Sequence, residues 1–311
     1  MNPETERLLG ILEFYKSSCR RMFVWDSSIR GYFNIWNLLL SERFVYSTEP
    51  EKAIKHWRNV EIWGTPTNQK KECIQYAPFR RERGKRSDNS YLLRERIEYY
   101  QALLYFLKKS LQNLQAYILT GYASSSLNLN FEQAEFCIVL GQTVSQDWIC
   151  LAPTAPDQIW GAYPRAKHPN ITSLTSCKSE NSDTQDLVEK INKIIARLKP
   201  IEIYGYYYGG YDYSYDHQIL CTSSSDLASS IELALQASTM LDIDGEFSLY
   251  DDDDNWNNDR DRISRFMHKH LKNRKCFTVS FWDVGYGYDL GCTPTGDWIG
   301  FKEYKEFEYN P

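Results

Sequence analysis

The chain has 311 residues, of which 42% are hydrophobic and 25% charged, and its net charge at pH 7 is −5. This length suffices for about two domains with buried cores. No apolar run approaches the roughly 18 residues that a membrane-spanning helix needs. The first residues also lack the basic flank and apolar stretch of a secretory signal, so we expect a cytoplasmic protein without a membrane partner.

Cysteine usage and charge distribution refine this expectation. The eight cysteines are dispersed and include no C-x-x-C pair, which agrees with a reducing compartment. Residues 1–184 carry 23 Lys and Arg against 19 Asp and Glu, whereas residues 185–311 carry 13 against 22. The asymmetry predicts two halves that face different partners or face each other.

The first half begins with helical spacing of apolar residues and ends with strand-like runs. Helices are expected at residues 4–18 and 49–63, and a strand, a turn and a second strand are expected within residues 21–36. The later elements are an exposed basic loop at 79–89, a long helix at 88–114, and strands within 115–122, 131–141 and 147–153.

A polar, proline-rich stretch then divides the chain, and residues 156–184 are expected to be a linker. The sequence restarts with a helix at 186–200, which Pro200 ends. The remaining expected elements are a hairpin at 201–220, a helix at 223–238, an acidic loop at 242–258, a helix at 259–273, and strands at 275–284, 285–291 and 297–307.

One pattern occurs twice, as "GQTVSQDWICL" from Gly141 and as "GCTPTGDWIGF" from Gly291. Each copy follows a helix and two strands, which an internal duplication of about 130 residues explains. Gly and Pro mark tight connections, so we expect a hairpin that contacts no ligand. Trp298 and Phe301, or Ile299 on the other face, should fill the core. The motif residues are Gly141, Thr143, Asp147, Trp148, Gly291, Thr293, Gly296, Asp297 and Trp298.

The end of the chain resembles the nuclease A inhibitor family of cyanobacteria, which closes with a helix and then strands around a G-x-T-x-x-G-x-x-x-G turn. The resemblance covers residues 265–305 well and residues 104–152 more weakly. In the first copy, Gln146 and Cys150 depart from the pattern. The matching residues are Gly291, Thr293, Gly296 and Gly300 in the second copy, with Gly141 and Thr143 in the first.

The resemblance implies an α+β fold of two similar domains, each an antiparallel sheet packed against helices. These domains would be residues 1–155, slightly basic, and residues 185–311, acidic, joined by the linker at 156–184. The resemblance also implies a non-catalytic protein that occludes a sugar-nonspecific nuclease through an acidic surface and a C-terminal tail.

Four adjacent carboxylates form the sharpest charge feature. They could mimic phosphates and bind a basic nuclease cleft, or they could be solvated residues that favour the dipole of the next helix. A Ca²⁺ loop is a third reading, but an EF-hand register from Asp251 places Trp256 at the Gly position and Arg262 at the Glu position. The candidate partner-binding residues are Asp251, Asp252, Asp253, Asp254, Asp259, Glu306 and Glu308.

Two further segments are candidate surfaces. A basic run could neutralise nucleic-acid phosphates or be a solvated loop. A tyrosine-rich hairpin could present aromatic side chains to a partner or be an ordinary amphipathic hairpin. The basic run consists of Arg80, Arg81, Arg83, Lys85 and Arg86, and the possible aromatic face consists of Tyr206, Tyr208, Tyr211 and Tyr213.

The sequence contains no phosphate loop, dinucleotide fingerprint, nucleophile elbow or zinc-helix spacing. We therefore expect a protein that is not an enzyme and that uses no cofactor and no metal. The first functional hypothesis is binding to a protein, with inhibition of a nuclease or another basic enzyme. The alternatives are a scaffold or adaptor subunit of a larger complex, and nucleic-acid binding through the basic run.

Overall fold

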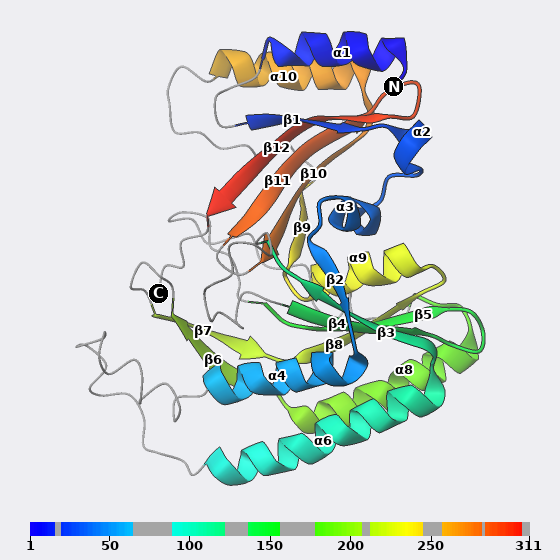
Figure 1. Cartoon of the computed structure of the whole chain (residues 1–311), viewed down its shortest axis with the longest axis vertical. Coiled ribbons are helices and arrows are strands. Elements are labelled where there is room, and N and C mark those ends of the chain that lie inside the picture. The colour runs from blue at the N-terminus through cyan, green and yellow to red at the C-terminus, as the bar shows by residue number, and fades with distance from the viewer. Residues whose placement is uncertain are drawn as a thin grey trace. The chain divides into compact units, whose positions relative to one another are not determined.

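A computed structural model of the chain shows helices and two five-stranded antiparallel sheets, so the expected α+β fold is confirmed (Figure 1). Two compact units are present. Unit 1 comprises residues 1–38, 241–280 and 284–306, and unit 2 comprises residues 39–240 with 281–283 and 307–311. The structure describes residues 1–15, 20–64, 89–121, 136–155, 178–206, 212–244, 257–281 and 284–306.

Unit 1 is built on a sheet with the strand order β1-β12-β11-β10-β9. Helices α1 and α10 cover one face of this sheet (Figure 1), and their apolar residues meet Ile299 and Phe301 of β12 in one buried cluster. The elements are α1 (Pro3–Glu13), β1 (Arg20–Trp25), α2 (Ser27–Arg30), β9 (Leu241–Asp244), α10 (Asn257–His270), β10 (Lys272–Phe281), β11 (Val284–Cys292) and β12 (Trp298–Glu306).

Unit 2 is built on a sheet with the strand order β2-β3-β4-β5-β8. The first part of the chain supplies β2 (Val45–Thr48), α4 (Pro50–Gly64), α6 (Asn89–Ser110), β3 (Gln112–Leu119), β4 (Phe136–Gln142) and β5 (Trp148–Pro153). The second part supplies α8 (Ser182–Ile195), the 3-10 helix η3 (Ala196–Leu198), β6 (Ile201–Tyr206), β7 (Asp212–His217), β8 (Ile219–Ser224) and α9 (Leu227–Ala237).

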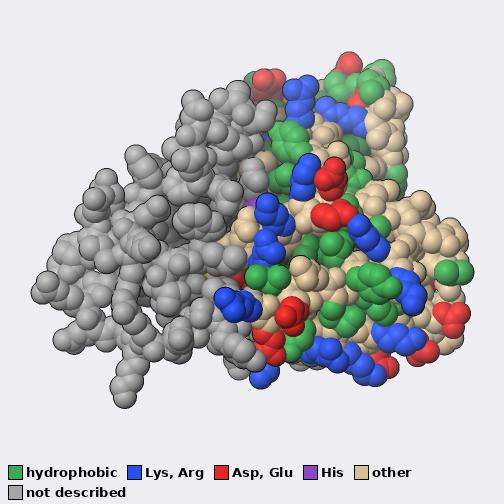
Figure 2. All heavy atoms as spheres, turned by 60° about the horizontal axis from the view of Figure 1, so that its bottom comes forward, with side chains coloured by type: hydrophobic (Ala, Val, Ile, Leu, Met, Phe, Trp, Pro, Cys, Tyr) green, Lys and Arg blue, Asp and Glu red, His purple; other side chains and the backbone are tan. Residues whose placement is uncertain are grey.

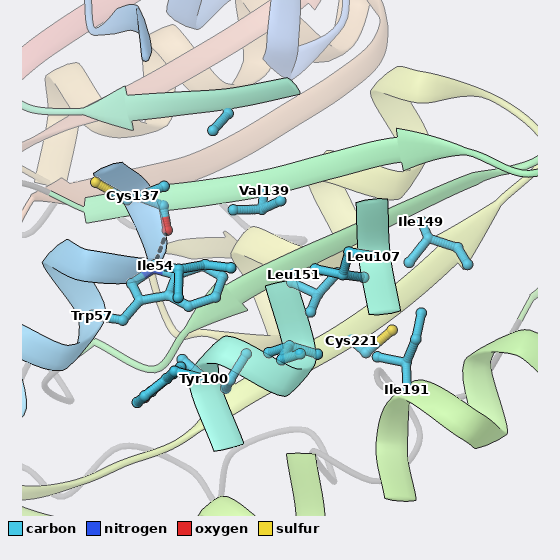
Figure 3. Close-up of a cluster of buried hydrophobic side chains, with 14 of the residues drawn as sticks. Ile54, Trp57, Tyr100, Leu107, Cys137, Val139, Ile149, Leu151, Ile191 and Cys221 are labelled. Atoms are coloured by element: carbon cyan, nitrogen blue, oxygen red, sulfur yellow. Dashed lines mark hydrogen bonds between the residues drawn. The ribbon is translucent and has the colours of Figure 1, made fainter. Parts of the chain in front are cut away.

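Helices α4, α6 and α8 pack on one face of this second sheet, and α9 packs on β5 and β8. Figure 3 shows the core on the α4, α6 and α8 side, where Leu107 and Ile191 meet Ile149 and Leu151. The indole of Trp57 donates a hydrogen bond to the carbonyl oxygen of Cys137 at 2.7 Å, which ties α4 to β4. Strands β6 and β7 form a separate two-stranded sheet.

The two five-stranded sheets repeat each other strand for strand. In unit 1, Trp25 of β1 pairs with Trp298 of β12, and in unit 2, Ser224 of β8 pairs with Trp148 of β5. At the opposite edges, Leu241 of β9 pairs with Val279, and Val45 of β2 pairs with Leu119. The order β1-β12-β11-β10-β9 therefore corresponds to β8-β5-β4-β3-β2, so the two halves of the chain fold alike.

The helices that precede β2 and β9 also end alike. Helix α3 (Ile35–Ser41) is followed by Arg43 with φ 62°, and α9 is followed by Thr239 with φ 65°. The amide of Arg43 donates to Leu40 O, and the amide of Thr239 donates to Gln236 O, each at 3.2 Å. This left-handed residue turns the chain from the helix into the next strand.

Each unit combines segments from both halves of the sequence. Strand β1 comes from the first half but pairs with β12 of the second, and β8 comes from the second half but pairs with β5 of the first. The chain passes from unit 1 to unit 2 at residues 38–39 and returns at residues 240–241. The compact units therefore differ from the expected contiguous domains 1–155 and 185–311, because equivalent edge positions accept the equivalent strand of either half.

This exchange changes the reading of the charge distribution. Unit 1 contains 14 Lys and Arg against 17 Asp and Glu, and unit 2 contains 22 against 24. The net charges of the two units, −3 and −2, are therefore nearly equal, whereas those of the two sequence halves are not. The expected basic and acidic domains are thus not the compact units.

One expected strand is wrong. Within residues 21–36, the segment after β1 forms α2 and the start of α3 instead of a second strand. The carboxylate of Asp26 accepts hydrogen bonds from the amide and hydroxyl of Ser28, and the side chain of Asn34 accepts one from the amide of Asn37. These caps satisfy backbone donors that a helix start leaves open, so helices begin where a turn and a strand were expected.

Candidate functional site

The repeated sequence forms the same hairpin turn twice. The amide of Thr143 donates to Asp147 O at 2.8 Å and the amide of Gln146 donates to Thr143 O at 3.0 Å. The second copy has the same bonds, from Thr293 to Asp297 O at 2.7 Å and from Gly296 to Thr293 O at 3.0 Å. This is a three-residue hairpin loop that ends in a left-handed residue.

The left-handed position explains one difference between the copies. Gly296 has φ 92° and Gln146 has φ 70°. A glycine adopts this conformation without steric cost, whereas a residue with a Cβ atom does not. In the first copy, Gln142 Nε2 donates to the backbone oxygen and to Oε1 of Gln146, at 3.2 and 3.0 Å, which gives this glutamine a local partner.

The first glycine of each motif is required by a close approach of the preceding helix end. A Cβ atom on Gly141 would lie 2.9 Å from Leu111 Cβ, and one on Gly291 would lie 2.6 Å from Leu271 Cβ. Real Cβ atoms essentially never come this close, so Gly141 and Gly291 let the helix end sit on the sheet. This supports the expected structural role of the motif.

The aspartate of each motif anchors the helix that the other half of the chain supplies. Asp297 Oδ2 accepts from the hydroxyl of Thr5 in α1 at 2.6 Å, and its Oδ1 accepts from the amide and hydroxyl of Ser27, each at 2.9 Å. Burial alone would raise the pKa of Asp297, but the hydrogen bonds from Thr5 and Ser27 outweigh it and lower that pKa.

Asp147 has the equivalent contacts in unit 2. Its Oδ2 accepts from the hydroxyl of Thr184 in α8 at 2.7 Å and from the hydroxyl of Ser179 at 2.5 Å. Sequence reasoning missed both threonines, although a signal was present. The helix starts read "NPET" at residues 2–5 and "NSDT" at residues 181–184, and Asn2 and Asn181 both cap their helices.

Trp298 of the motif lies on the face of the unit 1 sheet opposite to Phe301, with which we expected it to share a face. Ile299 and Phe301 belong to the cluster under α1 and α10, whereas Trp298 stacks on Phe33 with ring centroids 4.5 Å apart. The expected pairing of Trp298 with Phe301 is wrong, because residues three apart in a strand point to opposite faces. In the first copy, the carbonyl oxygen of Trp148 accepts from the hydroxyl of Ser230 of α9 at 3.3 Å.

The predicted partner-binding residues are described only in part. Asp259 lies in α10, and Glu306 ends β12, where it pairs with Val284. The other predicted contacts lie outside the described residues, namely Asp251, Asp252, Asp253, Asp254, Glu308, Arg80, Arg81, Arg83, Lys85 and Arg86.

The proposed aromatic face is described only in part and stays a prediction. Tyr206 pairs with Asp212, whereas Tyr213 pairs with Gly205. Tyr208 and Tyr211 lie outside the described residues.

A buried ionic cluster in unit 2 was not predicted. Glu61 of α4 accepts from Arg96 Nε at 2.8 Å, from Arg96 Nη2 at 2.5 Å and from the Tyr100 hydroxyl at 2.7 Å. Arg96 Nη1 also donates to the carbonyl oxygen of Lys199 at 3.0 Å. His217 Nδ1 of β7 lies 3.9 Å from Glu61 Oε1. The cluster therefore joins α4, α6, the end of η3 and β7.

Burial controls the protonation of this cluster. Burial lowers the pKa of His217 from 6.5 to about 4, and the carboxylate of Glu61 offsets this only in part. Burial and then the charge of Glu61 raise the pKa of Tyr100 well above 10. Burial would lower the pKa of Arg96, but the hydrogen bond and charge of Glu61 outweigh it and raise that pKa. At neutral pH the cluster thus holds one Glu–Arg ion pair, a neutral tyrosine and a neutral histidine.

This cluster belongs to parts of unit 2 that have no counterpart in the part of unit 1 that the structure describes. Helix α4 and the β6–β7 pair have no equivalents among the described elements of unit 1, and α6 has 22 residues where α10 has 14. Side chains that were unremarkable in sequence meet only because these additions pack together. Their chemistry is that of an internal brace, since the donors of Arg96 and Tyr100 already bind Glu61.

Charged side chains of both signs also lie on the described surface. Figure 2 shows positive and negative side chains interspersed over the described part of the face that is turned forward. On α8, Lys193 and Glu189 pair at 2.6 Å. No group of three or more potential metal ligands occurs among the residues that the structure describes, and none of the described helices could cross a membrane.

Comparisons with known proteins returned no relatives, because no family model, no curated protein and no solved structure matches the chain. The resemblance to nuclease A inhibitors therefore stays a prediction from the motif residues.

Proposed function

We propose that this chain is a non-catalytic protein-binding protein that inhibits a nuclease or another basic enzyme through an acidic surface. The observation that carries the proposal is the use of the buried carboxylates. Asp297 and Glu61 each accept three hydrogen bonds from protein donors, and Asp147 accepts two from side-chain hydroxyls. Asp297 and Glu61 thus use most of their acceptor sites within the fold, and Asp147 uses Oδ2 in the same way, so these carboxylates support the architecture.

The acidic segment supports the choice of a basic partner. Asp251–Asp254 lie a few residues before α10 in the sequence, and Asp259 lies in the first turn of that helix. Opposite charge accelerates encounter and selects among partners. The resemblance to nuclease A inhibitors points to a sugar-nonspecific nuclease as the first enzyme to test.

The test compares the wild-type chain with a variant in which Asp251, Asp252, Asp253 and Asp254 are replaced by Asn. A basic sugar-nonspecific nuclease is titrated with each protein, and the residual cleavage of DNA and the binding constant are measured. We expect the wild type to inhibit and the variant to bind at least tenfold more weakly, a loss that corresponds to about 1.4 kcal/mol.

A matched control removes acidic charge elsewhere. Asp186 and Glu189 lie exposed on α8, and their replacement by Asn and Gln should leave inhibition unchanged. Equal inhibition by the Asp251–Asp254 variant, or no binding by the wild type, would contradict the proposal. Tight binding of the wild type to single-stranded DNA would favour nucleic-acid binding instead.

A further inference from the structure

Unit 1 contains an acceptor site for a segment of the first half of the chain. We define the first donor segment as residues 2–38. Its strand β1 pairs with β12 from Arg20↔Glu303 to Trp25↔Trp298. Its helix α1 contributes Leu8 and Leu12 to the core with α10, and its Thr5 binds Asp297. The acceptor consists of residues from the second half only.

Unit 2 contains the reciprocal site. We define the second donor segment as residues 178–240. Its strand β8 pairs with β5 from Ile219↔Pro153 to Ser224↔Trp148. Its helix α8 contributes Val188 and Ile191 to the core that holds Leu107 of α6, and Thr184 binds Asp147. Figure 3 shows Ile191 beside Leu107 and Ile149 in this core.

We infer that residues 1–155 and residues 178–311 are binding partners for each other, and that each is completed by the donor segment of the other. Each half would bind an amphipathic helix capped by Asn-x-acid-Thr and followed by an edge strand. Addition of a strand to a sheet edge is a known mode of peptide recognition. Here it operates in both directions within one chain.

Reciprocity makes the association strong. Separation of the halves would remove an edge strand from both sheets and an apolar helix from both cores. It would also leave the carboxylates of Asp147 and Asp297 without their threonine donors. Two linked contact sets bind more tightly than either alone, because the second forms at a high effective concentration. The peptide connection through residues 156–177 is therefore dispensable once the chain has folded.

The experiment uses the full chain with a protease site introduced within residues 156–177. The folded protein is cleaved and then analysed by size-exclusion chromatography with light scattering. We expect both fragments to elute together at the 36.6 kDa of the intact chain. Elution of two separate fragments would overturn the inference.

A cross-link shows whether the donor segment itself holds the halves together. The hydroxyl oxygens of Thr5 and Thr295 lie 3.1 Å apart. In the cleaved T5C/T295C variant, oxidation should join the two fragments on a denaturing gel, and reduction should release them. The single variant T5C is the control. Fragments that elute together but fail to cross-link, or a dimer-sized band from the uncleaved variant, would contradict exchange within one chain.

A second variant weakens the donor segments without removing apolar contacts. Thr5 and Thr184 are replaced together by Val, which keeps the shape and deletes the hydroxyl that each aspartate binds. The cleaved double variant should release its fragments at least tenfold faster than cleaved wild type. The same pair of positions replaced by Ser restores the hydroxyl and should restore slow release. An unchanged release rate in the Val variant would show that the aspartates do not hold the segments.

Discussion

Unit 1 and unit 2 share a strand order, a turn and a helix-anchoring aspartate, but they differ in what surrounds the sheet. Among the described elements, α4 and the β6–β7 pair occur in unit 2 alone, and with α6 they enclose Glu61, Arg96, Tyr100 and His217. The shared parts are fixed by backbone geometry and short polar contacts. The difference teaches that the added elements carry their own buried ionic brace, on which the sheet of unit 1 does not depend.

The largest expected effect tests that brace. Glu61→Gln removes the negative charge that Arg96 needs and leaves a buried guanidinium without its ion partner. Breaking such a buried pair costs about 3–5 kcal/mol. Hydrogen exchange should show faster exchange in α4 and α6, with no change in the sheet of unit 1. As the control, Glu189→Gln removes an exposed pair on α8 and should cost at most about 1 kcal/mol. Equal effects on both units would refute a local brace.

A pH titration sharpens the comparison next. His217 has a pKa of about 4 in the folded chain, against 6.5 when unperturbed. Between these values the unfolded state binds a proton that the folded state does not. The stability that the neutral His217 contributes to unit 2 is therefore fully present above pH 6.5 and is lost as the pH falls toward 4. The slope is roughly 1.4 kcal/mol for each pH unit.

The measurement is the unfolding free energy of unit 2 from hydrogen exchange at pH 7, 6 and 5. The variant His217→Gln should flatten this dependence, whereas His268→Gln, at an exposed position of α10, should not. Glu61, Arg96 and His56 are the charged or titratable groups that act on His217. A slope that persists in His217→Gln would assign it to another group.

Alanine at the first motif glycine compares the two turns directly. The added Cβ would lie 2.6 Å from Leu271 in Gly291→Ala and 2.9 Å from Leu111 in Gly141→Ala. Overpacking of this kind costs about 1–3 kcal/mol. We expect both variants to be destabilised and Gly291→Ala to be the worse. Thermal unfolding of the two variants decides the order, and a neutral Gly291→Ala would show that the helix end can move away.

The smallest effect concerns the left-handed turn residue. Gly296→Gln should lose on the order of 1 kcal/mol, because φ 92° is unfavourable for a residue with a Cβ. Gln146→Gly should gain less than this, since it also removes the hydrogen bond from Gln142. Denaturant unfolding of the reciprocal pair measures both. A loss of stability in Gln146→Gly would mean that the hydrogen bond outweighs the backbone strain.

Local rules predicted most elements but not their assembly. Apolar spacing indicated the helices that became α1, α4, α6, α8, α9 and α10, and the repeated turn indicated the duplication. The spacing of apolar residues does not predict whether a sheet pairs with β1 or with β8, because the two strands occupy equivalent edge positions of the two sheets. The pairing of Trp25 with Trp298, and not with a strand of the first half, therefore did not follow from the sequence pattern.

The candidate sites show the same limit. The repeated turn could be predicted as structural because its chemistry is local, but the reason for Gly141 and Gly291, the approach of Leu111 and Leu271, could not. Glu61 and His217 could not be linked, since their contact depends on packing between elements far apart in the sequence. The acidic and basic runs stand out in the sequence, but the presence of charged residues does not predict which partner they contact.

The exchange of segments also determines which unit can fold first while the chain is being synthesised on the ribosome. Strand β1 ends at Trp25, but its partner β12 begins at Trp298. Unit 1 therefore cannot close until β12 (Trp298–Glu306) has been translated, whereas the helices and strands described for unit 2 are complete once residue 240 has emerged. Because domains generally fold as their residues become available, the N-terminal segment must wait while unit 2 folds first.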